Sequence, residues 1–148
     1  MLNGTVVLLG DGFASTSVAP LGNFLRRRAL WRELHGEAPA PYFSVTTATI
    51  DGKPITVPYG LSLGPQKSID EIERTDIIIV PTSGLLLDAR LIENHALLPW
   101  LRKHHAQGAY IAGICMGSAY LAEAGLLDGR DATTHWALGD DSRAVIRT

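Results

Sequence analysis

The sequence predicts a flavodoxin-like α/β fold, in which helices cover both faces of a doubly wound, mostly parallel sheet. Short apolar runs rich in β-branched residues recur along the chain, and helix-length segments with short turns separate them. The clearest runs are Thr5–Leu9, Asp76–Pro81 and Tyr110–Gly113. With 148 residues, 46% of them apolar and 19% charged, the chain has the size and composition of a globular protein with one core. Residues 1–148 are therefore expected to form one domain.

The N-terminal part should contain the central strand and the first covering helix. Thr5–Leu9 is apolar and ends at Gly10-Asp11-Gly12, which is the pattern of a strand buried on both faces. A helix should follow, reaching about Leu34 and stopping at His35-Gly36. We expect the hydroxyl side chain of Ser15, Thr16 or Ser17 to cap its N-terminus, and Pro20 to lie in its first turn.

The middle of the chain predicts a β-hairpin that extends the sheet. Tyr42–Ile50 alternates in polarity and is rich in β-branched residues, and Asp51-Gly52 separates it from Ile55–Val57. Further on, Ser68 and Glu71 have the spacing of a capping box, which predicts a short helix.

The second half should alternate strands and helices up to an early end. The expected elements are a strand at Asp76–Pro81, helices at Asp88–Ala96 and from Pro99 to Gly108, a buried strand at Tyr110–Gly113 and a helix at Ser118–Ala124. Beyond His135 there is only a helix-sized stretch, Leu138–Arg143, and a strand-like beginning, Val145–Thr148. We expect a domain that is truncated at its C-terminus, with an exposed sheet edge that favours association or modest stability.

Charge and cysteine content narrow the classes of function. The formal net charge is −2, so no overall basic field attracts nucleic acid or an anionic membrane. A single cysteine allows no internal disulfide and suits a reducing compartment. The N-terminus lacks the features of a signal peptide, and the apolar runs are too short to span a bilayer. The sequence therefore predicts a soluble cytoplasmic protein without a membrane partner.

Three glycine-containing turns should meet at the carboxyl edge of the sheet, where ligands bind in open α/β folds. They are Gly10-Asp11-Gly12, Thr82-Ser83-Gly84 and Gly113-Ile114-Cys115-Met116-Gly117. The last has the glycine-x-nucleophile-x-glycine form of a nucleophile elbow between a predicted strand and a predicted helix. A thiol at a helix N-terminus is favoured as thiolate, so Cys115 is the candidate nucleophile. The alternative is a small buried cysteine at a strand end.

A thiolate nucleophile usually needs an imidazole partner, and His135 is the candidate. It follows the short β-prone segment Thr133-Thr134, so it can return to the sheet edge that carries Cys115. A capping or hydrogen-bonded core histidine beside Trp136 is equally compatible with this spacing. His104 and His105 close a helix and are expected to complement its C-terminus. No grouping of residues predicts a metal site, and no cofactor is expected.

Three segments in the last third closely resemble the ThiJ/PfpI family of the class I glutamine amidotransferase-like superfamily. They are Gly113–Gly117 (GICMG), Leu121–Arg130 (LAEAGLLDGR) and Ala132–Trp136 (ATTHW). The similarity extends over the whole chain, and its nearest subgroup is the amidase-like sensory domain at the N-terminus of AraC-type transcription regulators.

This resemblance implies roles for three further residues. In the family, an acidic side chain from the loop after the first strand lies near the elbow cysteine, four residues before a proline. Counting back from Pro20 places Thr16 at that position, and threonine cannot act as acid or base at neutral pH. The resemblance also makes Gly84 and the Met116 amide the expected oxyanion donors, and backbone amides at such turns suit that role.

The leading hypothesis from the sequence is a ligand-sensing, regulatory domain of the AraC-associated type that has lost catalysis. The family implies a homodimer that binds a small molecule. No helix-turn-helix pair is present, so direct DNA binding by this chain alone is not expected. The alternatives are a cysteine-dependent amidase, hydrolase or isocyanide-hydratase-like enzyme with Cys115 as nucleophile, and a redox sensor in which Cys115 becomes a sulfinate.

Overall fold

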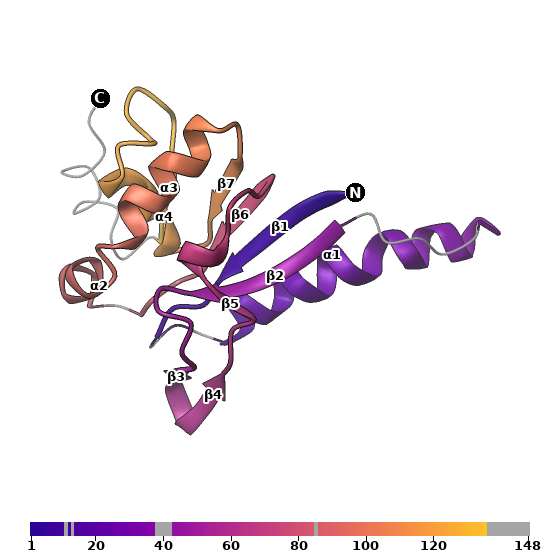
Figure 1. Cartoon of the computed structure of the whole chain (residues 1–148), viewed down its shortest axis with the longest axis horizontal. Coiled ribbons are helices and arrows are strands. Elements are labelled where there is room, and N and C mark those ends of the chain that lie inside the picture. The colour runs from indigo at the N-terminus through magenta and orange to yellow at the C-terminus, as the bar shows by residue number, and fades with distance from the viewer. Residues whose placement is uncertain (11, 13, 38–42, 85, 136–148) are drawn as a thin grey trace.

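The computed structural model describes residues 1–10, 12, 14–37, 43–84 and 86–135. Within them, five parallel strands form one sheet in the order β5-β2-β1-β6-β7. Their bounds are β1 Leu2–Val7, β2 Phe43–Thr49, β5 Lys67–Ser68, β6 Ile77–Val80 and β7 Tyr110–Gly113. Figure 1 shows this sheet with helices around it, so the predicted α/β fold with a mostly parallel sheet is confirmed.

The first strand lies in the centre of the sheet, as its apolar sequence predicts. β1 pairs with β2 on one side and with β6 on the other, in registers that place Val7 opposite Ala48 and Val6 opposite Ile79. All four of these side chains are buried. Because β1 connects onward to β2 and β6 connects onward to β7, the direction of winding reverses between β1 and β6. That reversal is where ligand-binding crevices form in such sheets.

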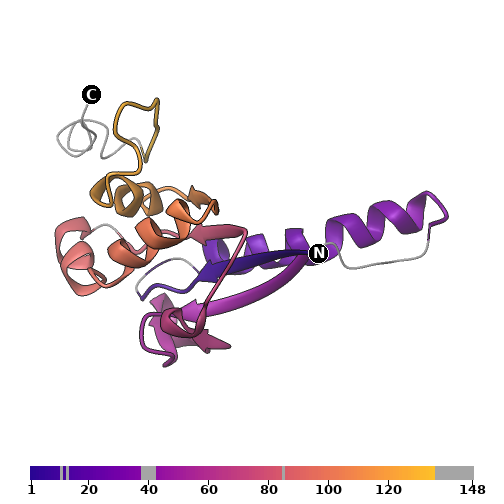
Figure 2. The same cartoon turned by 45° about the horizontal axis from the view of Figure 1, so that its top comes forward.

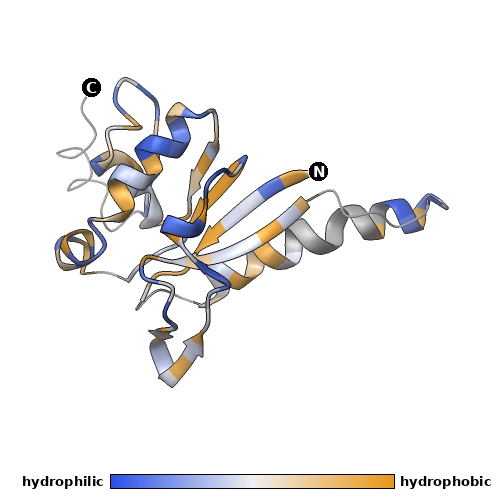
Figure 3. Ribbon diagram, in the orientation of Figure 1, coloured by the Kyte–Doolittle hydropathy of each residue, from blue (hydrophilic) through white to orange (hydrophobic). Residues whose placement is uncertain are grey.

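Helices cover both faces of the sheet. Figures 1 and 2 together show that α1 (Ala14–Leu34) covers one face of the sheet, behind the strands in Figure 1. The helices α3 (Leu97–Ala106) and α4 (Gly117–Glu123) cover the opposite, front face. The main core lies on the front face, where strand residues meet the two front helices: Val7, Leu9, Ile78, Val80, Leu97, Trp100, Leu101, Tyr120 and Leu121. Figure 3 shows apolar residues along β6 and the inner side of these helices.

The first helix starts earlier than predicted. It begins at Ala14, so the three hydroxyl residues expected to cap it lie inside it, and Pro20 lies in its second turn instead of its first. The predicted stop is confirmed, because the helix ends at Leu34 and Gly36 adopts a φ of 67°. The C-terminal half of α1 extends beyond the strands (Figures 1 and 2).

The predicted hairpin exists but joins different strands. β3 (Ile55–Val57) pairs antiparallel with β4 (Leu61–Leu63) in a sheet of their own, and Pro58–Gly60 makes the turn. The Asp51-Gly52 turn does not join two paired strands, because β2 already pairs with β1 and β5. This turn instead redirects the chain out of the sheet, with Gly52 at a φ of 76°. The hairpin projects from the carboxyl end of the sheet (Figure 1).

The predicted short helix after β5 is confirmed as a single 3₁₀ turn, Ile69–Glu71. The carboxylate of Glu71 accepts hydrogen bonds from the Ser68 amide at 2.7 Å and from its hydroxyl at 3.0 Å. The predicted helix after β6 is α2 (Leu87–Glu93). Within the described residues, no helix has both the length and the apolar character needed to cross a membrane.

Two expectations about burial are wrong. β7 is the edge strand of the described sheet and not a buried one, and Tyr110 is 81% exposed. The His104 side chain does not complement the C-terminus of α3, because it is fully buried in the core. The centroids of its ring and of the Trp100 ring lie 4.6 Å apart. The reason is helical spacing, since Leu97, Trp100, Leu101 and His104 share the inward face of α3.

Candidate functional site

The three glycine-containing turns meet at the carboxyl edge of the sheet. A Cβ on Gly12 would lie 2.0 Å from the carbonyl oxygen of Thr82, and a Cβ on Gly117 would lie 2.1 Å from that of Val80. Only glycine allows backbones to approach this closely. The loop after β1 and the turn after β7 are therefore both packed against the segment that leaves β6.

Cys115 lies at the sharpest point of the turn between β7 and α4. Its φ is 56°, in the left-handed region that is costly for a residue with a side chain. The turn is held by a hydrogen bond from the Ile114 amide to the Val80 carbonyl at 2.8 Å. A Cβ on Gly113 would lie 2.6 Å from the Ser118 nitrogen, so the turn is tight on both sides of the cysteine. The Cys115 residue itself is half-buried.

The segment before His135 reaches this turn. The carbonyl oxygen of Cys115 accepts hydrogen bonds from the hydroxyl of Ser118 at 2.7 Å and from that of Thr134 at 3.4 Å. The hydroxyl oxygens of Ser118 and Thr134 lie 2.8 Å apart, within hydrogen-bond distance of each other. His135 is half-buried and directly follows Thr134, so the chain that carries it returns to the Cys115 turn. A pairing of the His135 ring with the thiol remains a prediction.

The other predicted site residues lie on the elements that surround this turn. Gly84 closes the turn after β6 with a φ of 85°. Met116 directly precedes α4, and its side chain is buried. Thr16 is the third residue of α1 and is half-buried. Their roles as oxyanion donors or ligand contact remain predictions.

A buried polar network behind the turn was not anticipated from the sequence. The Tyr120 hydroxyl donates to the Ser83 hydroxyl oxygen at 2.7 Å and accepts a hydrogen bond from the Asn94 side-chain amide at 3.1 Å. Ser83 and Tyr120 are fully buried, and burial raises the pKa of the Tyr120 hydroxyl, which therefore stays protonated. The three residues come from three separate elements, and no local motif relates them.

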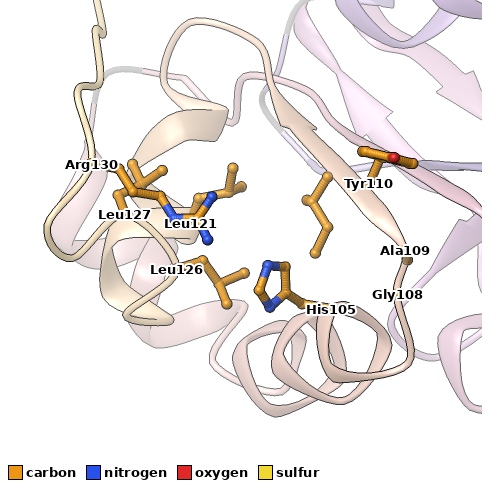
Figure 4. Close-up of a pocket in the computed structure, with 9 residues that line it drawn as sticks. His105, Gly108, Ala109, Tyr110, Leu121, Leu126, Leu127 and Arg130 are labelled. Carbon is orange, nitrogen blue, oxygen red and sulfur yellow. The ribbon is translucent and has the colours of Figure 1, made fainter.

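Two hollows lie near these elements. One, of about 450 Å³, lies outside the carboxyl ends of β1 and β2, between β3 and α2. The other, of about 380 Å³, lies beside β7, where His105 and Arg130 project from opposite walls over leucine side chains (Figure 4). Cys115 lines neither of them. Across the described ranges, no three His, Cys, Asp or Glu side chains come together as a metal-binding group.

Comparison with protein-family models matches residues 5–147 to the DJ-1/PfpI family. Two curated relatives are similar over nearly equal shares of the chain. An isonitrile hydratase of Pseudomonas putida is 38% identical over 87 residues, which are 59% of this chain and 37% of the relative. The HTH-type transcriptional regulator CdhR of Pseudomonas aeruginosa is 40% identical over 86 residues, 58% of this chain and 25% of the regulator.

Solved structures agree with the fold. An AraC family transcriptional regulator from Pseudomonas putida superposes with a TM-score of 0.76 at 19% identity, covering 99% of this chain and 73% of that one. Oxidized DJ-1 from Toxoplasma gondii superposes with a TM-score of 0.72 at 24% identity, covering all of this chain and 74% of that one. At these identities the likeness concerns the fold, and the curated matches each span well under half of the relative.

Proposed function

This chain belongs to the DJ-1/PfpI family, and from that membership we propose that it is the ligand-sensing domain of an AraC-type transcription regulator. In this role it binds a small molecule and leaves DNA binding to another part of the regulator. The similarity to the HTH-type regulators CdhR, at 40% identity, and GbdR, at 32% identity, supports the proposal.

The observation that carries this proposal is Thr16. The turn around Cys115 keeps the close glycine packing and the left-handed backbone of a nucleophile elbow. The family's enzymes tune such a thiol with an acid from the segment after the first strand, and this chain has a threonine there. A threonine hydroxyl can hydrogen-bond a ligand but cannot exchange a proton at neutral pH. A retained turn without its acid fits binding better than turnover.

A thermal-shift screen tests the sensing role. Small amides, aldehydes and nitrogenous metabolites are titrated against the 148-residue chain, and at least one should raise the melting temperature saturably, because a ligand that binds only the folded state stabilises it. Cys115→Ala serves as the comparison, since a sensor that needs no covalent chemistry keeps its response. A complete absence of binding across the panel contradicts the proposal.

The same proposal includes assembly and location. We expect a homodimer in the cytoplasm, since regulators of this type act on DNA there. Sedimentation equilibrium measures the mass directly, and a monomer at high micromolar concentration contradicts this part. A fluorescence anisotropy titration with duplex DNA should show no binding at physiological salt by the isolated chain.

The second candidate is a cysteine-dependent hydratase, and the 38% identity to an isonitrile hydratase favours it. In this function the Cys115 thiolate bonds to the isonitrile carbon while His135 protonates that carbon, which gives a thioimidate. Water then adds to the same carbon, and the C–S bond breaks to release the thiolate and the N-substituted formamide, with the amides of Gly84 and Met116 stabilising negative charge on the added oxygen. The assay follows the N-substituted formamide that forms when water adds to an alkyl isonitrile. Activity that persists at full rate in Cys115→Ser excludes this mechanism, and activity lost in Cys115→Ser favours it over pure sensing.

A further inference from the structure

A cluster of two hydroxyls and one carbonyl ties the Cys115 turn to the segment that carries His135. The Ser118 hydroxyl oxygen lies 2.7 Å from the Cys115 carbonyl oxygen and 2.8 Å from the Thr134 hydroxyl oxygen. Because each hydroxyl has one hydrogen to donate, both short distances are satisfied when Ser118 donates to the Cys115 carbonyl and Thr134 donates to Ser118. The direct contact of Thr134 with the carbonyl, at 3.4 Å, is longer and weaker. We call this cluster the hydroxyl clasp.

Thr134 is the residue at which the chain after α4 meets the turn. Residues 131–133 are exposed, and burial begins at Thr134 and His135, in a stretch that forms neither helix nor strand. Thr134 and Ser118 are 16 residues apart, so their bond joins two separate segments. The Cys115 carbonyl also accepts a hydrogen bond from the Ser118 backbone amide at 3.2 Å, so the backbone already closes the turn. What the two hydroxyls add is the attachment of the His135 segment.

The clasp also fixes the direction of the Met116 amide. The Cys115 carbonyl and the Met116 N–H belong to one planar peptide unit, which is trans, so the two groups point in opposite directions. A carbonyl that is held by Ser118 therefore holds the Met116 N–H as well. Hydrogen bonds in series polarise one another, so a peptide whose oxygen accepts a short bond has a stronger N–H donor. A fixed, polarised N–H is what an oxyanion site requires.

We propose that Ser118 and Thr134 are positioning residues of the Cys115 site. Ser118 orients the Met116 N–H, which binds a negatively charged oxygen of the ligand or of a reaction intermediate. Thr134 attaches the His135 segment to the same peptide unit, so one cluster fixes both the N–H donor and the histidine. Both candidate functions place their ligand or substrate at the Cys115 turn, and these roles rest on that proposed function.

Two reactions of Cys115 separate this role from simple access to the thiol, and the chain's single cysteine makes both specific. In acylation by p-nitrophenyl acetate, the thiol proton passes to a base and the sulfur bonds to the acetyl carbon. The carbonyl oxygen becomes an oxyanion, and p-nitrophenolate then leaves with the electron pair of the broken C–O bond. In alkylation by iodoacetamide, the sulfur displaces iodide and no oxyanion forms. The ratio of the two rate constants therefore measures oxyanion stabilisation.

Removal of the Ser118 hydroxyl should lower this ratio. We expect Ser118→Ala to reduce acylation relative to alkylation at least about threefold, after subtraction of the background rate of Cys115→Ala. Ser118→Thr keeps a hydroxyl and should restore most of the ratio. A change that only loosened the fold would alter both reactions together and leave the ratio unchanged. A ratio in Ser118→Ala that equals or exceeds the wild-type ratio overturns the role of Ser118.

Thr134→Val keeps the shape of the side chain and removes its hydrogen bond. It should slow acylation at least about twofold because the imidazole of the released segment no longer accepts the thiol proton, and Thr134→Ser should restore the rate. His135→Gln should therefore slow acylation in the wild-type chain and add little to Thr134→Val. Thr133→Val is the matched control, because Thr133 is exposed, and should leave the rate unchanged. Equal effects of His135→Gln in both backgrounds overturn the role of Thr134.

Circular dichroism checks the folding of each variant, and Ser118→Ala and Thr134→Val each give a decisive result if the other does not fold. The thermal-shift screen described above separates the possible failures. If acylation is unchanged in both variants while a compound of the screen binds, the positioning roles are wrong and the sensing function stands. If the ratio falls in Ser118→Ala and no compound binds, the positioning role stands and the sensing function is wrong.

Discussion

Replacing Tyr120 with phenylalanine removes one oxygen atom from the core and leaves the ring in place. The two shortest hydrogen bonds of that oxygen run to Ser83 at 2.7 Å and from Asn94 at 3.1 Å, and both partners are buried; a longer contact of 3.4 Å reaches the Arg90 carbonyl. Each such bond contributes about 1 kcal/mol net, so the loss of both should lower the free energy of unfolding by about 2 kcal/mol. The unpaired Ser83 and Asn94 groups left in the core raise this toward about 3 kcal/mol.

Urea unfolding followed by circular dichroism and by tryptophan fluorescence measures this loss, provided that the two transitions coincide. Tyr110→Phe is the matched control, because the Tyr110 side chain is exposed, and it should change the free energy by less than about 0.5 kcal/mol. Ser83→Ala and the double variant complete a cycle with an expected coupling of about 1 kcal/mol. A Tyr120→Phe protein as stable as wild type refutes the network.

The remaining predictions concern packing, pH and oxidation. Gly117→Ala should destabilise the protein by more than about 3 kcal/mol or prevent folding, because the added Cβ would lie 2.1 Å from the Val80 carbonyl oxygen. The control is Gly22→Ala on α1, where the added Cβ meets no atom within 4 Å. This variant should stabilise the protein by about 0.5–1 kcal/mol in the same urea assay. Burial, aided by the charge of Lys103, holds the pKa of His104 below its usual range. Stability should therefore be full above about pH 6.5 and fall as the pH drops below it, and His104→Phe, unlike the same change at the exposed His105, should flatten this slope. If Cys115 is a redox sensor, mild peroxide adds the mass of two oxygen atoms to its peptide, and an unchanged mass spectrum excludes that role.

Local sequence patterns predict many of the strands and turns of this fold. β1 and β6 are recognisable because short apolar runs end in glycine-containing turns, and a run of that kind is stable only inside a sheet. The turn around Cys115 is recognisable for the same reason, since glycines two residues on either side allow backbone contacts that no side chain could tolerate. The capping box of Ser68 and Glu71 can also be recognised from the sequence, because its two residues are only three positions apart and hydrogen-bond each other.

Contacts between distant segments required the tertiary structure. Asp51-Gly52 has the sequence of a hairpin turn, but both edges of β2 are already paired, with β1 and with β5, and the hairpin forms one segment later. β7 has the composition of a buried strand, and its position at the edge of the sheet formed by the described residues depends on which other strands pair with it. Local pattern cannot encode this choice of partner, because strand pairing is set by the whole sheet.

The sequence alone therefore determined the family, the order of the main strands and helices, and the place of Cys115 in the turn after β7. It could not determine the burial of His104 or the joining of Ser83, Asn94 and Tyr120 into one network. Those three residues lie on separate elements, and each has an ordinary local context. Their partnership arises only when α2 and α4 pack beside the turn after β6, where polar groups removed from water must find one another.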